Sequence, residues 1–227
     1  MVDNKPWKRQ RVLKAESIPS QQTILLMAKS FSKLEEQALF ILTYLTAGRI
    51  SEVVPRRFLY KNIYLHHFVD GEETNKLVMK DKKPVIVKRE KIMINYEGIR
   101  KKDIVQTIVA GKNVLEVHMA NRKHRKHKRK VVPIPIDREP LLIDILRNYV
   151  SKLDEEDPLF SFTVGKARNI LATVDMNPHF LRDIRLTHMV TMYGFNVFQL
   201  VRFAGWTTIS PAERYVMMST KDLVVNY

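Results

Sequence analysis

Ten residues near the middle of the chain, Asn121 to Lys130, read NRKHRKHKRK, and this run constrains the fold around it. Seven of the nine residues from Arg122 to Lys130 are Lys or Arg, and a cluster of unpaired charges has to stay largely in water. Alternating apolar segments flank the run, NVLEVHMA before it and VVPIPI after it. This pattern predicts two strands joined by a cationic hairpin tip. Pro133 and Pro135 lack the amide hydrogens of a central strand, so the second strand is expected at a sheet edge.

Helical periodicity dominates much of the remaining chain. The segment SKLEEQALFILTYLTAGR predicts a helix that begins at a capping box of Ser32 and Glu35. Gly48 is well placed to end this helix in the left-handed conformation, because glycine adopts that conformation without steric cost. Arg49 is then expected just beyond the helix end.

Cap residues and hydrophobic spacing predict the other elements. Helices are expected to begin at Pro140, Asn177-Pro178, Asn196 and Ser210-Pro211. Residues 60–98 instead indicate strands, with a hairpin at Asp70-Gly71 and a further strand pair in KPVIVKREKIMINY. We therefore predict an α+β fold that is mainly helical, with a small antiparallel sheet and a β-rich insertion at 60–98.

Charge and composition narrow the class of partner. The 227 residues include 39 Lys or Arg against 24 Asp or Glu, a formal net charge of +15, which favours a polyanionic partner such as nucleic acid. The absence of Cys excludes disulfides and thiolate metal sites. No apolar run approaches the ~20 residues that span a bilayer, and the first residues lack a signal-peptide core. We expect a soluble cytoplasmic protein with a basic arm or linker at 1–19 and one domain at 20–227.

Five short segments in a fixed order resemble the catalytic domain of the tyrosine recombinases, the phage-integrase family. They are TAGRISEV around Arg49, the Lys-rich tip before VVPIPI, HFLR with His179 and Arg182, the Gly-Trp pair ending at Trp206, and Tyr215 nine residues later. No single segment is specific, but the order and the spacing together are typical of this family, including archaeal and viral integrases. The resemblance covers roughly residues 20–227.

The sequence also departs from the family pattern. Asp183 follows Arg182, where members often carry His. Residues 60–98 form an unusually long connection. The N-terminal domain that clamps DNA in typical integrases is missing, so either the basic arm substitutes for it or the chain is a fragment of a longer protein.

The resemblance implies a role for each matching residue. Tyr215 would attack a scissile phosphate and form a 3′-phosphotyrosyl bond, while Arg49 and Arg182 would neutralise the phosphate oxygens as bidentate cations. His179 and Trp206 would donate hydrogen bonds to the phosphate. Taken singly, Tyr215 is the type of residue that packs on a helix and Arg49 the type that caps one, so the catalytic interpretation depends on the joint pattern.

The remaining roles belong to Glu52 and to the hairpin tip. Glu52 would hold a neighbouring cation in place. The leaving 5′ oxygen needs a proton, for which we favour Lys123 at the end of the first strand, with Lys126 as the alternative. The usual family spacing before Pro133 falls on Arg125, which is too weak an acid for this role. The other tip cations are expected to contact the DNA backbone: Arg122, Arg125, Lys128, Arg129 and Lys130.

The sequence thus predicts a site-specific DNA recombinase that needs no metal, ATP or other cofactor. By resemblance it would act on double-stranded DNA as a homotetramer on two DNA sites, with a monomer possible without DNA, in the host cytoplasm or nucleoid if the chain is viral. Two alternatives stay open. One is a nicking-closing enzyme of the type IB topoisomerase kind, and the other is a catalytically silent DNA-binding relative.

Overall fold

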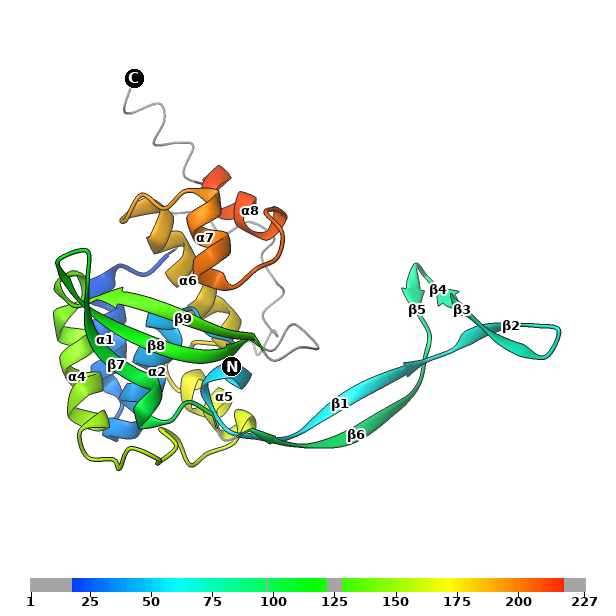
Figure 1. Ribbon diagram of the computed structural model, residues 1–227, viewed down its shortest axis with the longest axis horizontal. Coiled ribbons are helices and arrows are strands. Elements are labelled where there is room, and N and C mark those ends of the chain that lie inside the picture. Colours follow the sequence, from blue (N-terminus) through cyan, green and yellow to red (C-terminus); the bar gives the residue numbers. More distant parts are fainter. Residues whose placement is uncertain (1–17, 97, 122–127, 219–227) are drawn as a thin grey trace, which may run out of the picture. The chain divides into compact units, whose positions relative to one another are not determined.

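The computed structural model describes residues 18–96, 98–121 and 128–218, without the side chains of 57–60, 93–95, 121, 128–129 and 217–218. The chain divides into two compact units. The first combines the described parts of Met1–Pro55 and Gly98–Tyr227, and the second is Arg56–Glu97. Each unit is coloured by sequence in Figure 1. The bounds predicted for an insertion, 60–98, are close to those of the second unit. That this unit is an insertion stays a prediction.

Helices make up most of the first unit. Those described are α1 (Gln21–Ser30), α2 (Leu34–Thr46), α3 (Ile50–Val53), α4 (Pro140–Val150), α5 (Val164–Ala172), α6 (Pro178–Thr191), α7 (Val197–Ala204) and α8 (Ser210–Met218). The starts predicted at Pro140, Asn177-Pro178, Asn196 and Ser210-Pro211 are confirmed, and the last belongs to α8, which begins at Ser210. Pro140 occupies the first turn of α4, and the side chains of Asn177 and Asn196 accept backbone N–H bonds at the starts of α6 and α7. Helices α1, α3 and α5 were not predicted.

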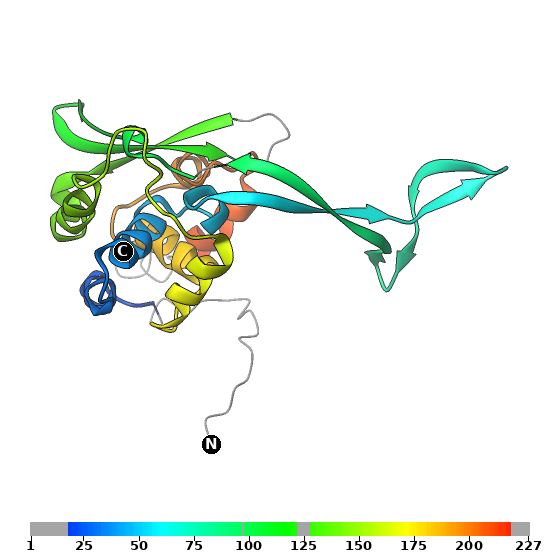
Figure 2. The same cartoon turned by 90° about the horizontal axis from the view of Figure 1, so that it is seen from below.

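The first unit also carries a three-stranded antiparallel sheet. Its order is β7 (Ile104–Val109), β8 (Lys112–Asn121) and β9 (Lys128–Pro135). Strands β8 and β9 confirm the predicted hairpin, and β9 lies at an edge as its prolines require. Leu115, Val117 and Met119 of β8 point into the core, and the sheet runs along one side of the helices (Figure 2). Strand β7 was not predicted.

Two local predictions about α2 are wrong. The N-cap of α2 is Lys33 and makes no side-chain cap bond; Glu35 instead accepts hydrogen bonds from the backbone N and the hydroxyl of Ser161. The left-handed residue after α2 is Ala47, with φ 44°, and Gly48 follows it. A Cβ on Gly48 would come within 2.8 Å of both Met119 Cε and Thr46 Oγ1, so a larger residue would make these side chains shift; Gly48 therefore serves close packing rather than helix termination.

The second unit consists of antiparallel strand pairs. Its strands are β1 (Arg56–Tyr64), β2 (His66–Val69), β3 (Glu72–Leu77), β4 (Met79–Lys80), β5 (Lys83–Pro84) and β6 (Ile86–Tyr96). The hairpin at Asp70-Gly71 is confirmed, because it joins β2 to β3 and both turn residues have positive φ. The segment predicted as a second strand pair instead contributes mainly one long strand, β6, which pairs with β1. The α+β class agrees with this arrangement, although strands take a larger share than a mainly helical chain would have.

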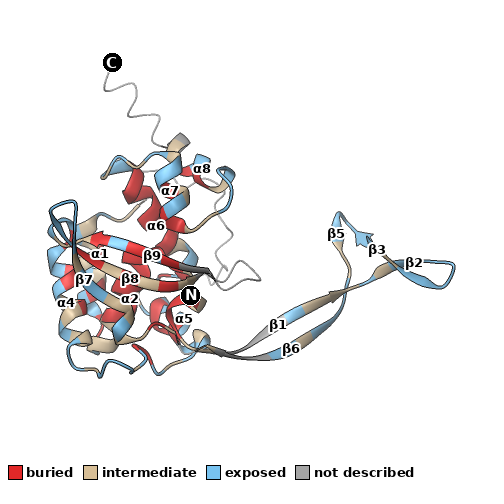
Figure 3. Cartoon of the chain, viewed as in Figure 1, coloured by how far each residue is buried: buried red, intermediate tan, exposed pale blue. Residues whose placement is uncertain are grey.

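The core of the first unit is built on α2 and α6, where buried residues gather (Figure 3). Between these helices and α4 lies a buried ion pair, in which the Arg185 guanidinium of α6 donates to the carboxylate of Glu139, the N-cap of α4. The Tyr193 hydroxyl donates to the same carboxylate oxygen at 2.7 Å. Burial of Arg185 would by itself lower its pKa, but Glu139 and the neighbouring tyrosines more than offset this and raise the pKa. Within the described ranges, no helix is long and apolar enough to cross a membrane.

We predict that Glu139→Gln destabilises the fold by about 3 kcal/mol at neutral pH, because it leaves the Arg185 charge buried without its partner. Denaturant unfolding followed by circular dichroism measures this change. The double variant Glu139→Gln/Arg185→Met removes both charges and should recover much of the loss. A single variant as stable as the wild type would show that the pair does not stabilise the core.

Candidate active site

Arg49 and Glu52 form the first corner of the candidate site. Arg49 is the N-cap of α3, reached through the left-handed Ala47 and the tightly packed Gly48. The Glu52 carboxylate accepts two bonds from this residue, one from the Arg49 backbone N at 3.0 Å and one from the Arg49 guanidinium at 2.9 Å. Glu52 is 1% exposed, whereas the Arg49 side chain is 28% exposed. Glu52 therefore orients Arg49 and leaves part of its guanidinium open to an anion.

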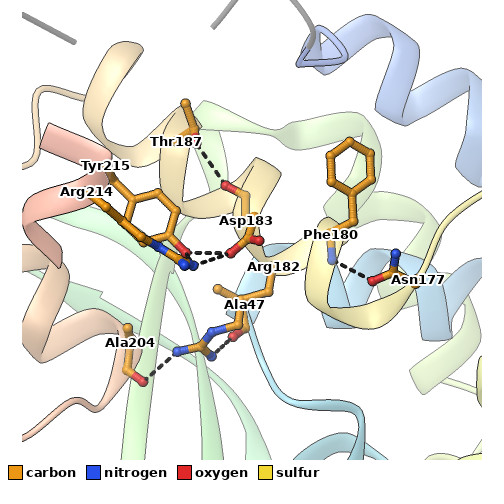
Figure 4. A network of polar contacts seen from close by, with 9 residues as sticks. All are labelled: Ala47, Asn177, Phe180, Arg182, Asp183, Thr187, Ala204, Arg214 and Tyr215. Atoms are coloured by element: carbon orange, nitrogen blue, oxygen red, sulfur yellow. Dashed lines mark hydrogen bonds and ion pairs between the residues drawn. The ribbon is translucent and has the colours of Figure 1, made fainter. Parts of the chain in front are cut away.

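Arg182 forms the second corner and is largely buried on α6, at 6% exposure. Its guanidinium donates to two backbone carbonyls, those of Ala47 and Ala204 (Figure 4). These carbonyls lie at the C-terminal ends of α2 and α7, where helix carbonyls lack partners and carry partial negative charge. Burial and the nearby Arg49 charge lower the pKa of Arg182. Two guanidinium groups thus lie within electrostatic reach of each other, and the Glu52 carboxylate partly offsets their charge.

Tyr215 of α8 lies beside this pair. Its ring stacks on Trp206, with centroids 5.9 Å apart and planes at 16°, and the Arg182 guanidinium carbon lies 5.5 Å from the Trp206 centroid. The Tyr215 hydroxyl donates to Asp183 Oδ1 at 2.5 Å (Figure 4). Tyr215 is 1% exposed, and its pKa is raised by burial and by the Asp183 carboxylate. The hydroxyl is therefore held in its neutral form.

Lys130 of β9 supplies a further cation. It is 9% exposed, and its Nζ is one of the buried atoms without a hydrogen-bond partner within the described part of the chain. Burial lowers the pKa of Lys130 to about 8, partly countered by Glu52 and reinforced by Arg182 and Arg49. The structure therefore places Lys130 beside both corners of the site, although the sequence had grouped it with the cations of an exposed tip.

The other predicted residues are placed less fully. His179 is exposed in the first turn of α6, three residues before Arg182 on the same helix. Lys128 and Arg129 lie on β9, but their side chains are outside the described residues, as are Arg122, Lys123, Arg125 and Lys126 altogether. In the described part, no group of three or more His, Asp or Glu residues is arranged to hold a metal ion. The structure therefore brings together Arg49, Glu52, Lys130, Arg182, Trp206 and Tyr215.

Comparison with solved structures identifies the fold. No family model and no curated protein sequence matches the chain. The chain is similar to the XerH site-specific recombinase bound to its difH substrate in a pre-cleavage complex, with a TM-score of 0.53 and 12% identity over 94% of this chain. It is also similar to the XerA recombinase, with a TM-score of 0.51 and 14% identity over 96% of this chain. The chain has the tyrosine recombinase fold.

The chain matches only part of each of these recombinase structures. The chain spans 52% of the XerH structure and 66% of the XerA structure. At this level of identity the likeness establishes the recombinase fold, and the roles of individual residues remain predictions. The fold is thus the one that the sequence resemblance implied. It carries the predicted segments in the predicted order: Arg49, the hairpin, Arg182, Trp206 and Tyr215.

Two residues of the site were missed or misplaced by sequence reasoning. The alternation of side chains along a strand could have predicted the position of Lys130. On β9, Val132 and Ile134 are buried, whereas Val131 is exposed. Lys130 shares the inward face by the same two-residue period. For Asp183 the sequence showed only a departure from the family, and its contact with Tyr215 bridges 32 positions.

We predict that Lys130→Met stabilises the protein. Keeping a charged Lys130 in the fold costs about 3 kcal/mol at neutral pH, since its pKa of about 8 lies below the ordinary lysine value. The unfolded chain holds this proton more tightly, so the cost declines as pH rises from about 8 toward ~10.5. Denaturant unfolding at about pH 7 and about pH 10 measures the free energy of unfolding. The gain in this free energy for Lys130→Met should be smaller at the higher pH. If Lys130→Met is no more stable than the wild type at pH 7, other interactions compensate the cost of burying the Lys130 charge.

Proposed function

We propose that this protein is a site-specific DNA recombinase that cuts and rejoins DNA through a 3′-phosphotyrosyl bond to Tyr215. The observation that carries the proposal is the convergence of Arg49, Lys130 and Arg182 beside Tyr215 on a recombinase fold. Arg182 and Lys130 are largely buried, and Arg49 is partly exposed; Glu52 offsets only part of the positive charge of the three, and a phosphate between them would relieve the remaining repulsion. Structural ion pairing alone does not call for such an excess of positive charge.

We expect these side chains to share the work of an in-line attack on a phosphodiester. Arg49 and Arg182 would bind the non-bridging oxygens and stabilise the charge that develops on them in the transition state. Trp206 stacks on Tyr215 and lies next to Arg182, so it would hold the nucleophile against the phosphate-binding group. His179, three residues before Arg182, would add a hydrogen bond to the phosphate from the same helix.

We assign proton donation to Lys130 in preference to Lys123 or Lys126. A general acid works best when its pKa lies close to the operating pH, and burial lowers the pKa of Lys130 to about 8. Lys130 is also within electrostatic reach of both arginines. The attack by Tyr215 forms the bond to phosphorus, the bond to the 5′ oxygen breaks, and that oxygen takes a proton from Lys130. The neutral lysine then accepts a proton from the 5′ hydroxyl that reverses the step.

The partner proposed is double-stranded DNA. The net charge of +15 and the cationic tip favour a long polyanion, and the XerH structure contains its DNA substrate. A homotetramer on two DNA sites follows only from the resemblance. Product analysis separates the proposal from a nicking-closing enzyme, because recombination joins two duplexes whereas a nicking-closing enzyme relaxes supercoils.

We predict that Tyr215→Phe abolishes covalent attachment. The variant lacks the attacking oxygen and keeps the ring that stacks on Trp206, so folding and DNA binding should persist. The assay incubates the protein with nicked suicide duplexes and detects a protein–DNA band on a denaturing gel. Tyr193→Phe is the matched control, since Tyr193 belongs to the Glu139 network and should still form the adduct. If Tyr215→Phe still formed a covalent adduct, Tyr215 would not be the nucleophile.

We predict that sulfur in place of the bridging 5′ oxygen rescues Lys130→Met, because a thiolate leaves without a proton. On the oxygen substrate this variant should cleave at least about a hundredfold more slowly than the wild type. Wild-type cleavage of the oxygen substrate should also fall as pH rises through about 8, where Lys130 loses its proton.

The comparison variants are Lys123→Met and Lys126→Met. They should weaken DNA binding with a modest change in cleavage and no selective rescue by sulfur. Selective rescue of either one would move proton donation to that residue. If sulfur rescued cleavage by none of the three variants, no hairpin lysine would donate the proton, and the hairpin would only contact DNA electrostatically.

A further inference from the structure

Asp183 accepts a hydrogen bond from the hydroxyl of Tyr215. Its Oδ1 accepts the Tyr215 hydroxyl proton at 2.5 Å and a bond from Arg214 Nη2 at 2.8 Å. Arg214 also donates to the Tyr215 hydroxyl oxygen, and its guanidinium carbon lies 4.6 Å from the Tyr215 ring centroid. These three side chains, from α6 and α8, form a closed polar triangle (Figure 4).

A tyrosine must lose its proton to attack phosphorus, and the surroundings of Tyr215 limit where that proton can go. The side chain is 1% exposed, so bulk water has little access to accept it. Burial and the Asp183 carboxylate raise the pKa of Tyr215, which keeps a free phenolate scarce at neutral pH. The Asp183 carboxylate is already hydrogen-bonded to the phenolic proton, which is the geometry that general-base catalysis requires.

We infer that Asp183 is the general base of the cleavage step. As the Tyr215 oxygen bonds to phosphorus, its proton passes to Asp183 Oδ1, while the 5′ oxygen leaves with a proton from Lys130. In the rejoining step the 5′ hydroxyl gives its proton to Lys130, and Asp183 returns its proton to the departing Tyr215 oxygen. A phenolic hydroxyl offers one donor and two lone pairs, so a lone pair remains for phosphorus after the bond from Arg214 is made.

The neighbouring charges permit a carboxylate beside a phosphate. Arg214 of α8 neutralises Asp183 directly, with its side chain 61% exposed and that of Asp183 26% exposed. Arg182 on the same helix as Asp183 adds a second positive charge, and Arg49, Glu52 and Lys130 act on Arg182 from α3 and β9. The net charge around the hydroxyl is therefore positive, and protonation of Asp183 makes it more so as the anionic transition state forms.

This inference rests on the proposed function, since it names the proton acceptor for the same tyrosine. The test is Asp183→Asn, which keeps the size and an acceptor oxygen but removes the basic carboxylate. The substrate is the suicide duplex with bridging 5′ sulfur, because it removes the need for Lys130 and isolates the nucleophile. Glu213→Gln is the matched control, as it removes one negative charge from an exposed position on α8, two residues before Tyr215.

Adduct formation by Asp183→Asn should be at least about a hundredfold slower than that of the wild type at pH 7. Its rate should rise about tenfold per pH unit from about pH 7 to pH 9, as hydroxide takes over the proton, while the wild-type rate stays nearly flat. Glu213→Gln should match the wild type in both rate and pH profile. Thermal unfolding of each variant checks that Asp183→Asn retains its fold.

Three outcomes overturn the inference. An Asp183→Asn rate equal to that of the wild type would make the contact a packing feature. A faster rate would make Asp183 a restraint on Tyr215. A slow rate with the same flat pH profile as the wild type would make Asp183 a positioning residue only. A wild-type protein that forms no adduct on this substrate would instead contradict the proposed function itself, so the two failures are distinguishable.

Discussion

The guanidinium of Arg182 joins two helix ends that the rest of the site depends on. It donates to the carbonyls of Ala47 and Ala204, which close α2 and α7. Each of these ends turns through a left-handed residue, Ala47 itself after α2 and Gly205 after α7. The first turn leads to Arg49, and the second leads to Trp206. One buried cation therefore fixes the positions from which both a second cation and the aromatic partner of Tyr215 project.

Helix-end carbonyls are suited to this role because they are acceptors that the helix cannot satisfy. A guanidinium has five N–H donors in a fixed plane, so it can bond two carbonyls and still present donors elsewhere. A lysine offers a point charge without that plane. Burial of Arg182 then follows from its structural contacts, while its proximity to Arg49 and Lys130 leaves an excess of positive charge. The same side chain serves both the fold and the candidate phosphate site.

The buried pair of Arg185 and Glu139 supports this arrangement further along α6. It lies one turn beyond Arg182 along the helix and ties α6 to the start of α4. Tyr44 of α2 adds a hydrogen bond to His188 on α6 at 2.8 Å. Burial and the nearby Arg185 charge lower the pKa of His188, so this histidine is held neutral. The helix that carries Arg182 and Asp183 is thereby tied to both α2 and α4.

The sequence by itself determined the elements whose signals are local. Asn177-Pro178 and Asn196 set the starts of α6 and α7, and Asp70-Gly71 set a hairpin turn, because each depends on bonds within a few residues. The alternation of NVLEVHMA and VVPIPI predicted β8 and β9 for the same reason. The order of the five family-like segments predicted the recombinase fold.

Only the tertiary structure decided which side chains meet. Helix α2 has its N-cap at Lys33, one residue later than expected, so Glu35 is not in a capping box and instead accepts hydrogen bonds from Ser161, which is distant in sequence. Ala47 adopts the left-handed conformation that was expected of Gly48, and Gly48 packs closely against Met119 and Thr46. Lys130 turned inward with Val132 and Ile134, and Asp183 met Tyr215 from another helix. Contacts of this kind depend on burial and on distances between elements, which the local pattern of a sequence does not encode.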